Sequence, residues 1–280
     1  MANLIPMAGI GSRFTDGGHL LPKALIPVSG IPMIAKVIRE MPPSDKWIFI
    51  VRKEHVDDYQ IDKIIKKEKP EAIIILIDYT TEGQACTCML AESHLDPEEE
   101  LFIAACDNSS LINEDNYNKL KEDPEIDAII WTFTKRIMLK ENPHSYGWVK
   151  LAEDNLTIKD ISVKKPISDD PYKDHAVVAS FYFKNSKDFF TAAKLMIEEN
   201  YRINNEFYVD AIPLFLTKIN KRSVIFDVDL FLLWGAPKEL YIYQEKEYYF
   251  RNNIQQPSMS DEDKRLYNVW QRYFKQTRTS

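Results

Sequence analysis

The sequence predicts an α/β fold with a mostly parallel central sheet that is covered by helices on both faces. The expected strands of the first half are short, continuous apolar runs, which are typical of strands buried on both faces. These runs alternate with segments of helical spacing, as in successive strand–helix–strand units. The chain has 280 residues, 45% of them hydrophobic, which is enough to bury the core of one large α/β domain.

In the first half, expected strands and helices alternate. Pro32–Met41 is expected to be a helix because proline suits a first helical turn. Glu54–Lys67 is another, since its apolar residues recur on one side, and Gln84–His94 is a third. The expected strands are Asn3–Met7, Trp47–Val51, Ala72–Ile77, Leu101–Cys106 and Asp127–Thr134. Sheets of this kind bind ligands at the carboxyl ends of their strands.

The second half is first rich in strands and then helical. We predict one domain over residues 1–240 and a helical, aromatic-rich extension over residues 241–280, with a linker at 255–260. The extension would pack on the main domain or on a second copy of the chain, which would make a homo-oligomer. The expected strands are Trp148–Leu151, Ile158–Val163, Ala176–Phe183 and Ser223–Phe231, and the expected helices are Ser186–Asn200, Glu206–Asn220, Glu239–Phe250 and Asp261–Lys275.

Composition excludes several classes of protein. The net charge of −7 argues against a general nucleic-acid binder, which is usually basic. No apolar run approaches the ~20 residues of a membrane span, and no basic leader precedes the first apolar run, so we expect neither a span nor a signal peptide. The three cysteines, Cys86, Cys88 and Cys106, suit a reducing compartment and predict a cytoplasmic protein.

The strongest motif, AGIGSR at residues 8–13, follows the first expected strand and precedes a Pro-Lys pair that ends at Lys23. Gly9 and Gly11 lack side chains, so the backbone can approach a phosphate, and successive N–H groups in such a turn bind anions. Arg13 offers a planar fork to phosphate oxygens, and Lys23 a compact positive charge. The motif lacks the Gly-Lys-Ser/Thr of a P-loop and the third glycine of a dinucleotide-binding fingerprint.

This opening resembles that of the sugar nucleotidyltransferases (sugar-phosphate nucleotidylyltransferases, or NDP-sugar pyrophosphorylases). The resemblance is specific at the start and extends weakly over about the first 240 residues. It implies a Rossmann-like, three-layer α/β/α nucleotidyltransferase fold with a mixed, mostly parallel central sheet. It also implies that Arg13 and Lys23 neutralise a bound triphosphate as catalytic residues. The residues that would bind the triphosphate are Ala8, Gly9, Gly11, Ser12, Arg13 and Lys23.

Two further motifs follow expected strands. Glu82, Gly83 and Gln84 stand where the family has a segment near the nucleobase, which implies base contacts, although Gly83 can equally serve a simple strand-to-helix turn. Asp107 directly follows a buried strand, and the resemblance implies that it binds catalytic Mg²⁺; the alternative is a turn-capping aspartate. Magnesium accepts one or two carboxylates together with phosphates and water.

Weaker motifs imply an acceptor site. Tyr146 and Gly147 resemble the family's Tyr-Gly segment beside the sugar, and Lys165 matches the lysine that contacts the acceptor phosphate. Lys164 replaces the preceding glutamate, which commonly contacts the sugar, so the acceptor stays open and a solvated lysine pair is the alternative. Glu206 either binds acceptor hydroxyls or suits a helix N-terminus.

One segment departs from the family. Many relatives have Asp-x-Gly-Thr-Pro near residue 233, and that aspartate is a second metal ligand, whereas this chain has Leu233. Asp227 and Asp229 alternate within an expected strand and would share one face. We assign the second metal carboxylate to Asp229, with Asp227 as one alternative and a metal held only by Asp107, phosphates and water as the other. The five histidines lack any catalytic or metal-ligand spacing, so we expect them to be structural or surface residues.

Together these residues predict a Mg²⁺-dependent nucleotidyltransferase. It would transfer a nucleoside monophosphate from an NTP to a sugar 1-phosphate, release pyrophosphate and supply an NDP-sugar for surface polysaccharide or glycoconjugate synthesis. A cytidylyltransferase acting on a phosphorylated alcohol or amino compound is one alternative. A glycosyltransferase and a non-catalytic nucleotide-sugar-binding protein are others, and Leu233 favours the last. The sequence does not choose the nucleobase.

Overall fold

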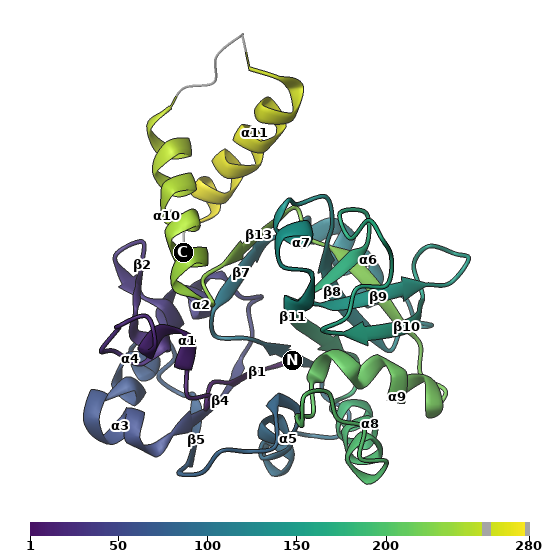
Figure 1. Cartoon of the computed structure of the whole chain (residues 1–280). Helices are drawn as coiled ribbons and strands as arrows, with labels where there is room; N and C mark the ends of the chain where they lie inside the picture. The colour runs from purple at the N-terminus through teal and green to yellow at the C-terminus, as the bar shows by residue number, and fades with distance from the viewer. Residues whose placement is uncertain (254–258, 278–280) are drawn as a thin grey trace.

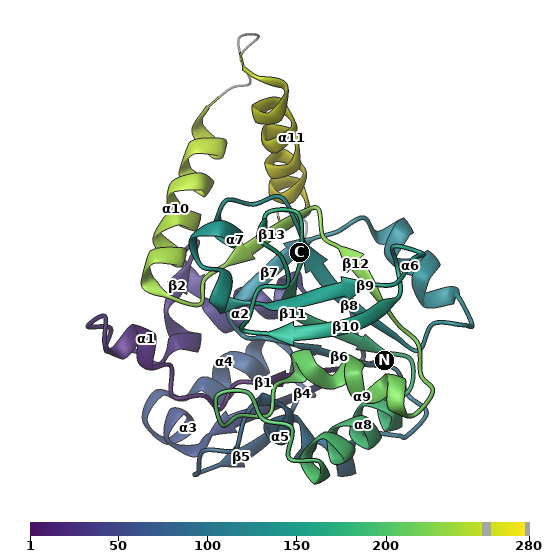
Figure 2. The same ribbon diagram turned by 45° about the vertical axis from the view of Figure 1, so that its right-hand side comes forward.

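The computed structural model describes residues 1–253 and 259–277, so most of the predicted linker lies outside the described residues. Within them, a central sheet of nine strands runs through the main body (Figure 1). Helices lie on both sides of this sheet, as the turned view in Figure 2 shows. The predicted α/β class, with a mixed sheet that is parallel in its core, is confirmed.

Four parallel strands form one half of the sheet. β1 (Ala2–Pro6) lies between β4 (Lys46–Arg52) and β6 (Leu101–Ala104), and β5 (Ile73–Ile77) pairs with the outer side of β4. Each is a nearly continuous apolar run, as strands covered on both faces require. Because the strands are parallel, their carboxyl ends meet at one edge of the sheet.

The other half is mixed. β11 (His175–Phe183) is antiparallel to β6 and also to β8 (Ala128–Phe133), and β12 (Ser223–Asp227) runs parallel to β8. The hairpin of β9 (Gly147–Leu151) and β10 (Ile158–Val163) completes the sheet through β9, which is antiparallel to β11.

An irregularity in β11 opens the sheet beside the end of β6. The register of β11 against β8 shifts between Val177 and Phe181, and Ala179 there has a φ of 57°. Beyond this bulge β11 pairs with β6, whereas before it β11 pairs with β9. The β9–β10 hairpin therefore diverges from the parallel strands at their carboxyl edge, because a bulge bends and twists a strand.

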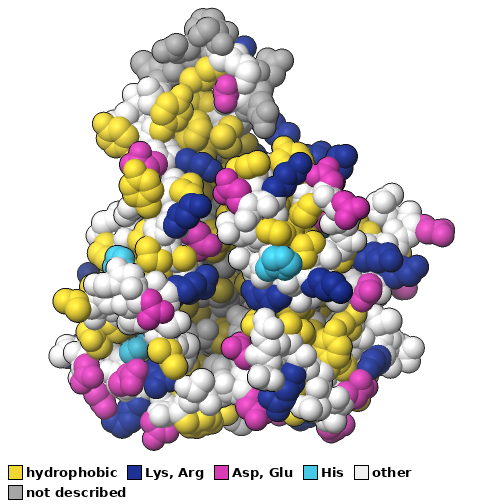
Figure 3. Space-filling view, in the orientation of Figure 1, with side chains coloured by type: hydrophobic (Ala, Val, Ile, Leu, Met, Phe, Trp, Pro, Cys, Tyr) yellow, Lys and Arg dark blue, Asp and Glu magenta, His cyan; other side chains and the backbone are white. Residues whose placement is uncertain are grey.

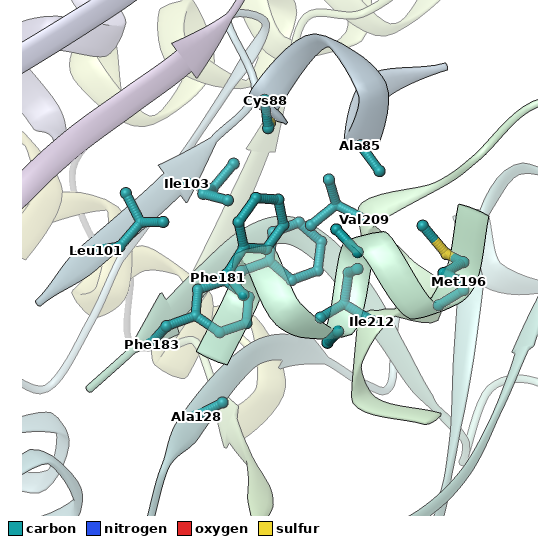
Figure 4. Packing of buried hydrophobic residues seen from close by; sticks show 14 of the residues in the cluster. Ala85, Cys88, Leu101, Ile103, Ala128, Phe181, Phe183, Met196, Val209 and Ile212 are labelled. Carbon is teal, nitrogen blue, oxygen red and sulfur yellow. The ribbon is translucent and has the colours of Figure 1, made fainter. Parts of the chain in front are cut away.

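Apolar side chains pack on both faces of the sheet. On one face, α5 (Gln84–Met89), α8 (Ser186–Glu198) and α9 (Ile212–Lys218) cover a core that contains Phe181. Figure 4 shows Phe181 between Ile103 of β6 and Ile212 of α9. The opposite face is covered by α2 (Met33–Glu40), α4 (Ile61–Glu68), α6 (Glu114–Glu122) and the C-terminal helices.

Two predicted helices of the first half are shorter than expected. The one over Glu54–Lys67 is interrupted at Gln60, whose φ of 54° is left-handed, so α3 (Lys53–Tyr59) and α4 are separate helices. Beyond the break, Ile61 and Ile65 of α4 are buried in the core that α2 also lines. The helix predicted over Gln84–His94 ends at Met89, and a 3₁₀ turn follows at residues 92–94.

Two predictions for the second half are wrong in detail. The expected strand Ser223–Phe231 is split into β12 and β13 (Leu230–Leu233), because the chain leaves β8 after Asp227 and pairs with β7 (Asn108–Leu111) instead. The helix expected from Glu206 starts only at α9, where proline in the first turn suits a helix start.

The chain ends in two helices, α10 (Pro237–Asn252) and α11 (Asp261–Gln276), which project from the main body (Figures 1 and 2). Their aromatic side chains join the core that α2 covers. The buried ammonium of Lys36 in α2 lies 5.5 Å from the ring centre of Tyr273 and 5.7 Å from that of Trp234. In the described part of the chain, every helix is too short or too polar to span a bilayer. The division at residue 240 stays a prediction.

Candidate active site

The glycine-rich loop forms one wall of a cavity at the carboxyl edge of the sheet. Gly11 has a φ of 72° and precedes α1 (Ser12–Thr15), so the loop needs a residue that tolerates the left-handed region. A Cβ on Gly11 would lie 3.2 Å from Cβ of Lys23. A Cβ on Gly9 would meet no atom within 4 Å, so Gly9 keeps open space above the backbone.

Lys23 and Asp107 form a mostly buried ion pair in this cavity. Burial lowers the pKa of the Lys23 ammonium, but the nearby negative charges, chiefly that of Asp107, and the hydrogen bond to Asp107 together raise it above its usual value. Burial acts in the opposite direction on Asp107, and the positive charge and hydrogen bond of Lys23 hold the pKa of this carboxyl below its usual value. Both groups are therefore charged at neutral pH, as an electrostatic site for phosphates requires.

The cavity has a volume of about 330 Å³ and combines the strand ends with the loop. Figure 3 shows Lys and Arg side chains gathered around a hollow near the middle of this face. This local positive charge is what an acidic protein needs in order to bind an anionic substrate. The cavity is lined by Pro6, Met7, Gly9, Gly11, Ser12, Arg13, Lys23, Ala24, His55, Gln84, Ala105, Cys106, Asp107 and Gly235.

A second carboxylate, which the sequence analysis did not identify, lies beside Asp107. A Cβ placed on Gly235 would lie 2.8 Å from Oδ2 of Asp107 and 3.2 Å from Oε2 of Glu239, and Nη2 of Arg13 is 3.5 Å from the same point. Burial raises the pKa of the Glu239 carboxyl, and Arg13 opposes this shift. Glu239 lies in the first turn of α10, directly after β13, and this position was the one available hint.

His55 and Cys106 are further cavity residues without an assigned role. His55 follows β4 and is 8% exposed, and its Nδ1 is buried without a hydrogen-bond partner among the described residues. Burial lowers the pKa of this imidazole. Burial also raises the pKa of the Cys106 thiol to about 11, so it stays protonated. His55 was expected to be structural because no sequence pattern connects it with the glycine-rich loop. In the structure, His55 and the loop line the same cavity.

The predicted base-binding segment divides into two parts. Gln84 lines the cavity, whereas Glu82 pairs with Arg202 at 2.9 Å. A Cβ on Gly83 would lie 2.5 Å from the backbone N of Phe207, which donates a hydrogen bond to the carbonyl of Glu82. Gly83 therefore permits a close contact between two backbones, and base binding at this residue stays a prediction.

The predicted acceptor residues lie near the start of β9. Tyr146 is buried, and a Cβ on Gly147 would lie 2.6 Å from Oδ2 of Asp210, so the glycine allows the carboxylate to approach. Burial raises the pKa of the Asp210 carboxyl, and Lys164 counteracts the shift. Burial and then the charges of Glu239 and Glu141 raise the pKa of the Tyr146 hydroxyl.

The remaining predicted acceptor residues, Lys165 and Glu206, both have exposed side chains. The Lys164 ammonium lies 5.7 Å from the ring centre of Tyr208, while the Lys165 side chain is exposed. Glu206 does not begin a helix: it pairs with Ile203 across a tight turn and its side chain is exposed. Of the lysine pair, Lys164 lies near Tyr208 and Asp210, and acceptor binding by Lys165 and Glu206 stays a prediction.

Neither aspartate proposed as a second metal ligand is brought to Asp107. Asp227 accepts hydrogen bonds from Thr132 at 2.7 Å and His175 at 2.9 Å. Asp229 pairs with Arg272 at 2.9 Å. Asp229 precedes the end of β13 that pairs with Leu111, whereas Asp107 precedes Asn108 at the opposite end of β7. These two ends of β7 are roughly 10 Å apart at the usual rise of a strand.

The donor atoms at the cavity fit a hard cation such as Mg²⁺. Oδ1 of Asp107 has one long contact, 3.5 Å from Nδ2 of Asn108, and Oε2 of Glu239 is buried without a hydrogen-bond partner. Leu233, which pairs with Asn108, offers no side-chain oxygen. Among the described residues, no group of three or more His, Cys, Asp or Glu side chains forms a metal cluster. A magnesium site here would thus depend on substrate phosphates as well.

Comparisons with solved structures identify the fold. No family model and no curated protein matches the sequence. The nucleoside-diphosphate-sugar pyrophosphorylase of Vibrio cholerae is similar over 87% of this chain and 99% of its own, with a TM-score of 0.69 and 17% identity. The inositol-1-phosphate CTP transferase of T. maritima is similar over 91% of this chain and 98% of its own, with a TM-score of 0.66 and 15% identity. A UDP-glucose pyrophosphorylase in complex with UDP-glucose is similar over 90% of this chain and 99% of its own, with a TM-score of 0.68 and 16% identity. The chain therefore has the fold of these nucleotidyltransferases.

Proposed function

We propose that this protein is a nucleotidyltransferase that joins a nucleoside monophosphate from an NTP to a phosphorylated small molecule, a sugar 1-phosphate first of all. One observation carries the proposal: the glycine-rich loop, Arg13, Lys23 and Asp107 converge on one cavity at the carboxyl edge of the sheet. The fold shared with sugar-nucleotide pyrophosphorylases supports it. In this proposal the enzyme acts in the cytoplasm and its product serves surface polysaccharide or glycoconjugate synthesis.

The chemistry needs positioning and charge more than a general base. An oxygen of the acceptor phosphate attacks the α-phosphorus, a new P–O bond forms, and the bond from the α-phosphorus to the β-phosphate oxygen breaks. The electron pair of that bond leaves with pyrophosphate. Arg13 and Lys23 stabilise the charge on the leaving group, and the loop N–H groups orient the phosphates. Magnesium, held by Asp107, would neutralise part of the triphosphate charge when bound.

A phosphorylated alcohol is the second candidate acceptor. Lys164, which replaces the glutamate that commonly contacts the sugar in the similar family, lies near Asp210 and Tyr208, so an acceptor other than a sugar suits this position. The structural similarity to an inositol-1-phosphate CTP transferase favours the same class. The corresponding reaction would consume CTP.

The test is a matrix of NTPs against phosphorylated sugars and alcohols, with Mg²⁺ and a continuous assay of pyrophosphate. Release that requires both substrates supports the proposal, and the best pair names the substrates. Release without an acceptor would indicate a hydrolase. Tight NTP binding with no turnover for any acceptor would favour a sensor protein instead.

A further inference from the structure

Glu239 is a partly buried carboxylate beside the Lys23–Asp107 ion pair, and the proposed reaction does not use it. Glu239 extends from the first turn of α10 toward the point where a side chain of Gly235 would begin. Gly235 lines the cavity, and a Cβ there would lie 2.8 Å from Oδ2 of Asp107 and 3.2 Å from Oε2 of Glu239. The missing side chain of Gly235 thus leaves a space flanked by two carboxylate oxygens.

The hydrogen bonding of these oxygens is incomplete. Oε2 of Glu239 is buried without a partner among the described residues. Oδ2 of Asp107, the oxygen beside Gly235, accepts the hydrogen bond of Lys23, and Oδ1 has only the 3.5 Å contact with Asn108. A buried carboxylate oxygen without a partner is costly, so the Glu239 oxygen, which lies beside the cavity wall formed by Gly235, lacks a ligand that a bound cation would supply.

We propose that Glu239 is the second protein ligand of the divalent cation that Asp107 binds. This inference rests on the proposed function, which brings the cation and the nucleotide triphosphate to this cavity. Two carboxylates with phosphate oxygens and water form an oxygen coordination that Mg²⁺ prefers. Leu233 and Asp229 do not compete for this role, because the side chain of the first has no oxygen and the second pairs with Arg272.

The competing explanation is that Glu239 only balances the charge of Arg13. Within the part of the chain that the structure describes, no ion pair joins Glu239 to Arg13, although both side chains approach Gly235. The two explanations differ in what removal of the Glu239 charge does. A counter-charge would oppose nucleotide binding with or without metal, whereas a metal ligand would favour it only when metal is present.

The test compares wild type, Glu239→Gln and the control Glu245→Gln, which changes an exposed glutamate of the same helix. Calorimetry with Mn²⁺ alone measures metal affinity. Titration with UTP or CTP in EDTA and in Mn²⁺ measures how strongly the metal promotes nucleotide binding. Circular dichroism checks that each variant is folded, and Glu239→Asp serves as a second variant that keeps a carboxylate.

We expect Glu239→Gln to weaken Mn²⁺ binding by at least about tenfold, as losses around metal sites typically do, and to leave nucleotide binding in EDTA unchanged or tighter. The Mn²⁺ affinity of Glu239→Asp is expected to lie between those of Glu239→Gln and wild type. Glu245→Gln is expected to bind Mn²⁺ as wild type does. Equal Mn²⁺ affinity of wild type and Glu239→Gln would overturn this inference and leave the proposed function standing. Wild type that binds neither Mn²⁺ nor a nucleotide would overturn both.

Discussion

The ammonium of Lys23 and the carboxylate of Asp107, 84 residues apart in the chain, form an ion pair on the cavity wall. The pair joins the segment after the glycine-rich loop to the end of β6. It brings opposite charges to the place where the proposed reaction needs both a cation for phosphate and a carboxylate for metal. Substitutions can separate the contribution of this ion pair to stability from its role in the proposed reaction.

Lys23→Met removes the ammonium and leaves the buried Asp107 charge without its partner. We expect stability to fall by about 3–5 kcal/mol, measured by urea unfolding, and the proposed pyrophosphate release to fall more than about a hundredfold. The double variant Lys23→Met/Asp107→Asn removes both charges and should regain much of the stability but none of the activity. Recovery of turnover in the double variant would contradict the catalytic roles.

Gly83→Ala and Gly9→Ala are expected to have opposite consequences. A Cβ on Gly83 would lie 2.5 Å from the backbone N of Phe207 at a φ of 131°, so we expect a loss of roughly 2–4 kcal/mol in urea unfolding. Gly9→Ala meets no neighbouring atom and should change stability by about 0.5 kcal/mol or less. It should nevertheless weaken nucleotide binding, since the methyl group would occupy cavity space.

Trp270→Ala tests whether the C-terminal helices belong to the main core. Trp270 is 1% exposed and joins the core that contains the α2 side chains. We expect a loss of about 3–5 kcal/mol. The control Tyr248→Ala, which changes a side chain that is 71% exposed, should be nearly neutral. Wild-type stability of a chain that ends at residue 240 would instead show that the predicted extension folds separately.

His55 is expected to make stability depend on pH. Its pKa is lower in the folded protein than in the unfolded chain, because burial disfavours the charged imidazole. Below about pH 6.5 the unfolded chain therefore binds more protons, and stability decreases as the pH falls. Unfolding of His55→Gln at pH 7.5 and 5.5 should show a smaller decrease than wild type. The exposed His144→Gln should keep the wild-type decrease.

The sequence predicted the architecture because the parallel strands are encoded locally, as continuous apolar runs. It predicted the grouping of Gly9, Gly11, Arg13 and Lys23 for the same reason, since they lie within one short segment. The prediction from sequence failed where tertiary contacts determine the backbone conformation. Gln60 breaks a helix that is periodic on both sides, and the break is favoured by packing of α4 against α2 rather than by a local stop signal.

The second carboxylate was missed for a related reason. Asp229 has the right chemistry and a plausible position in the sequence, but the change of strand partner after Asp227 directs it toward Arg272. Glu239 stands in a helix rich in charged residues, where nothing in the spacing distinguishes it. Its position depends on the corner between β13 and α10 and on the missing side chain of Gly235. Such relationships between distant segments are visible only once the chain is folded.

The cavity joins the glycine-rich loop to Gly235, which lies far later in the chain, and this has a consequence for protein synthesis. Its glycine-rich wall is translated long before Gly235 and the aromatic residues of α10 and α11. A nascent chain on the ribosome therefore carries an open anion-binding loop and an uncovered apolar face until α10 and α11 have been translated. Folding that waits for such distant contacts is slow, and chaperones would be expected to bind the growing chain during that interval.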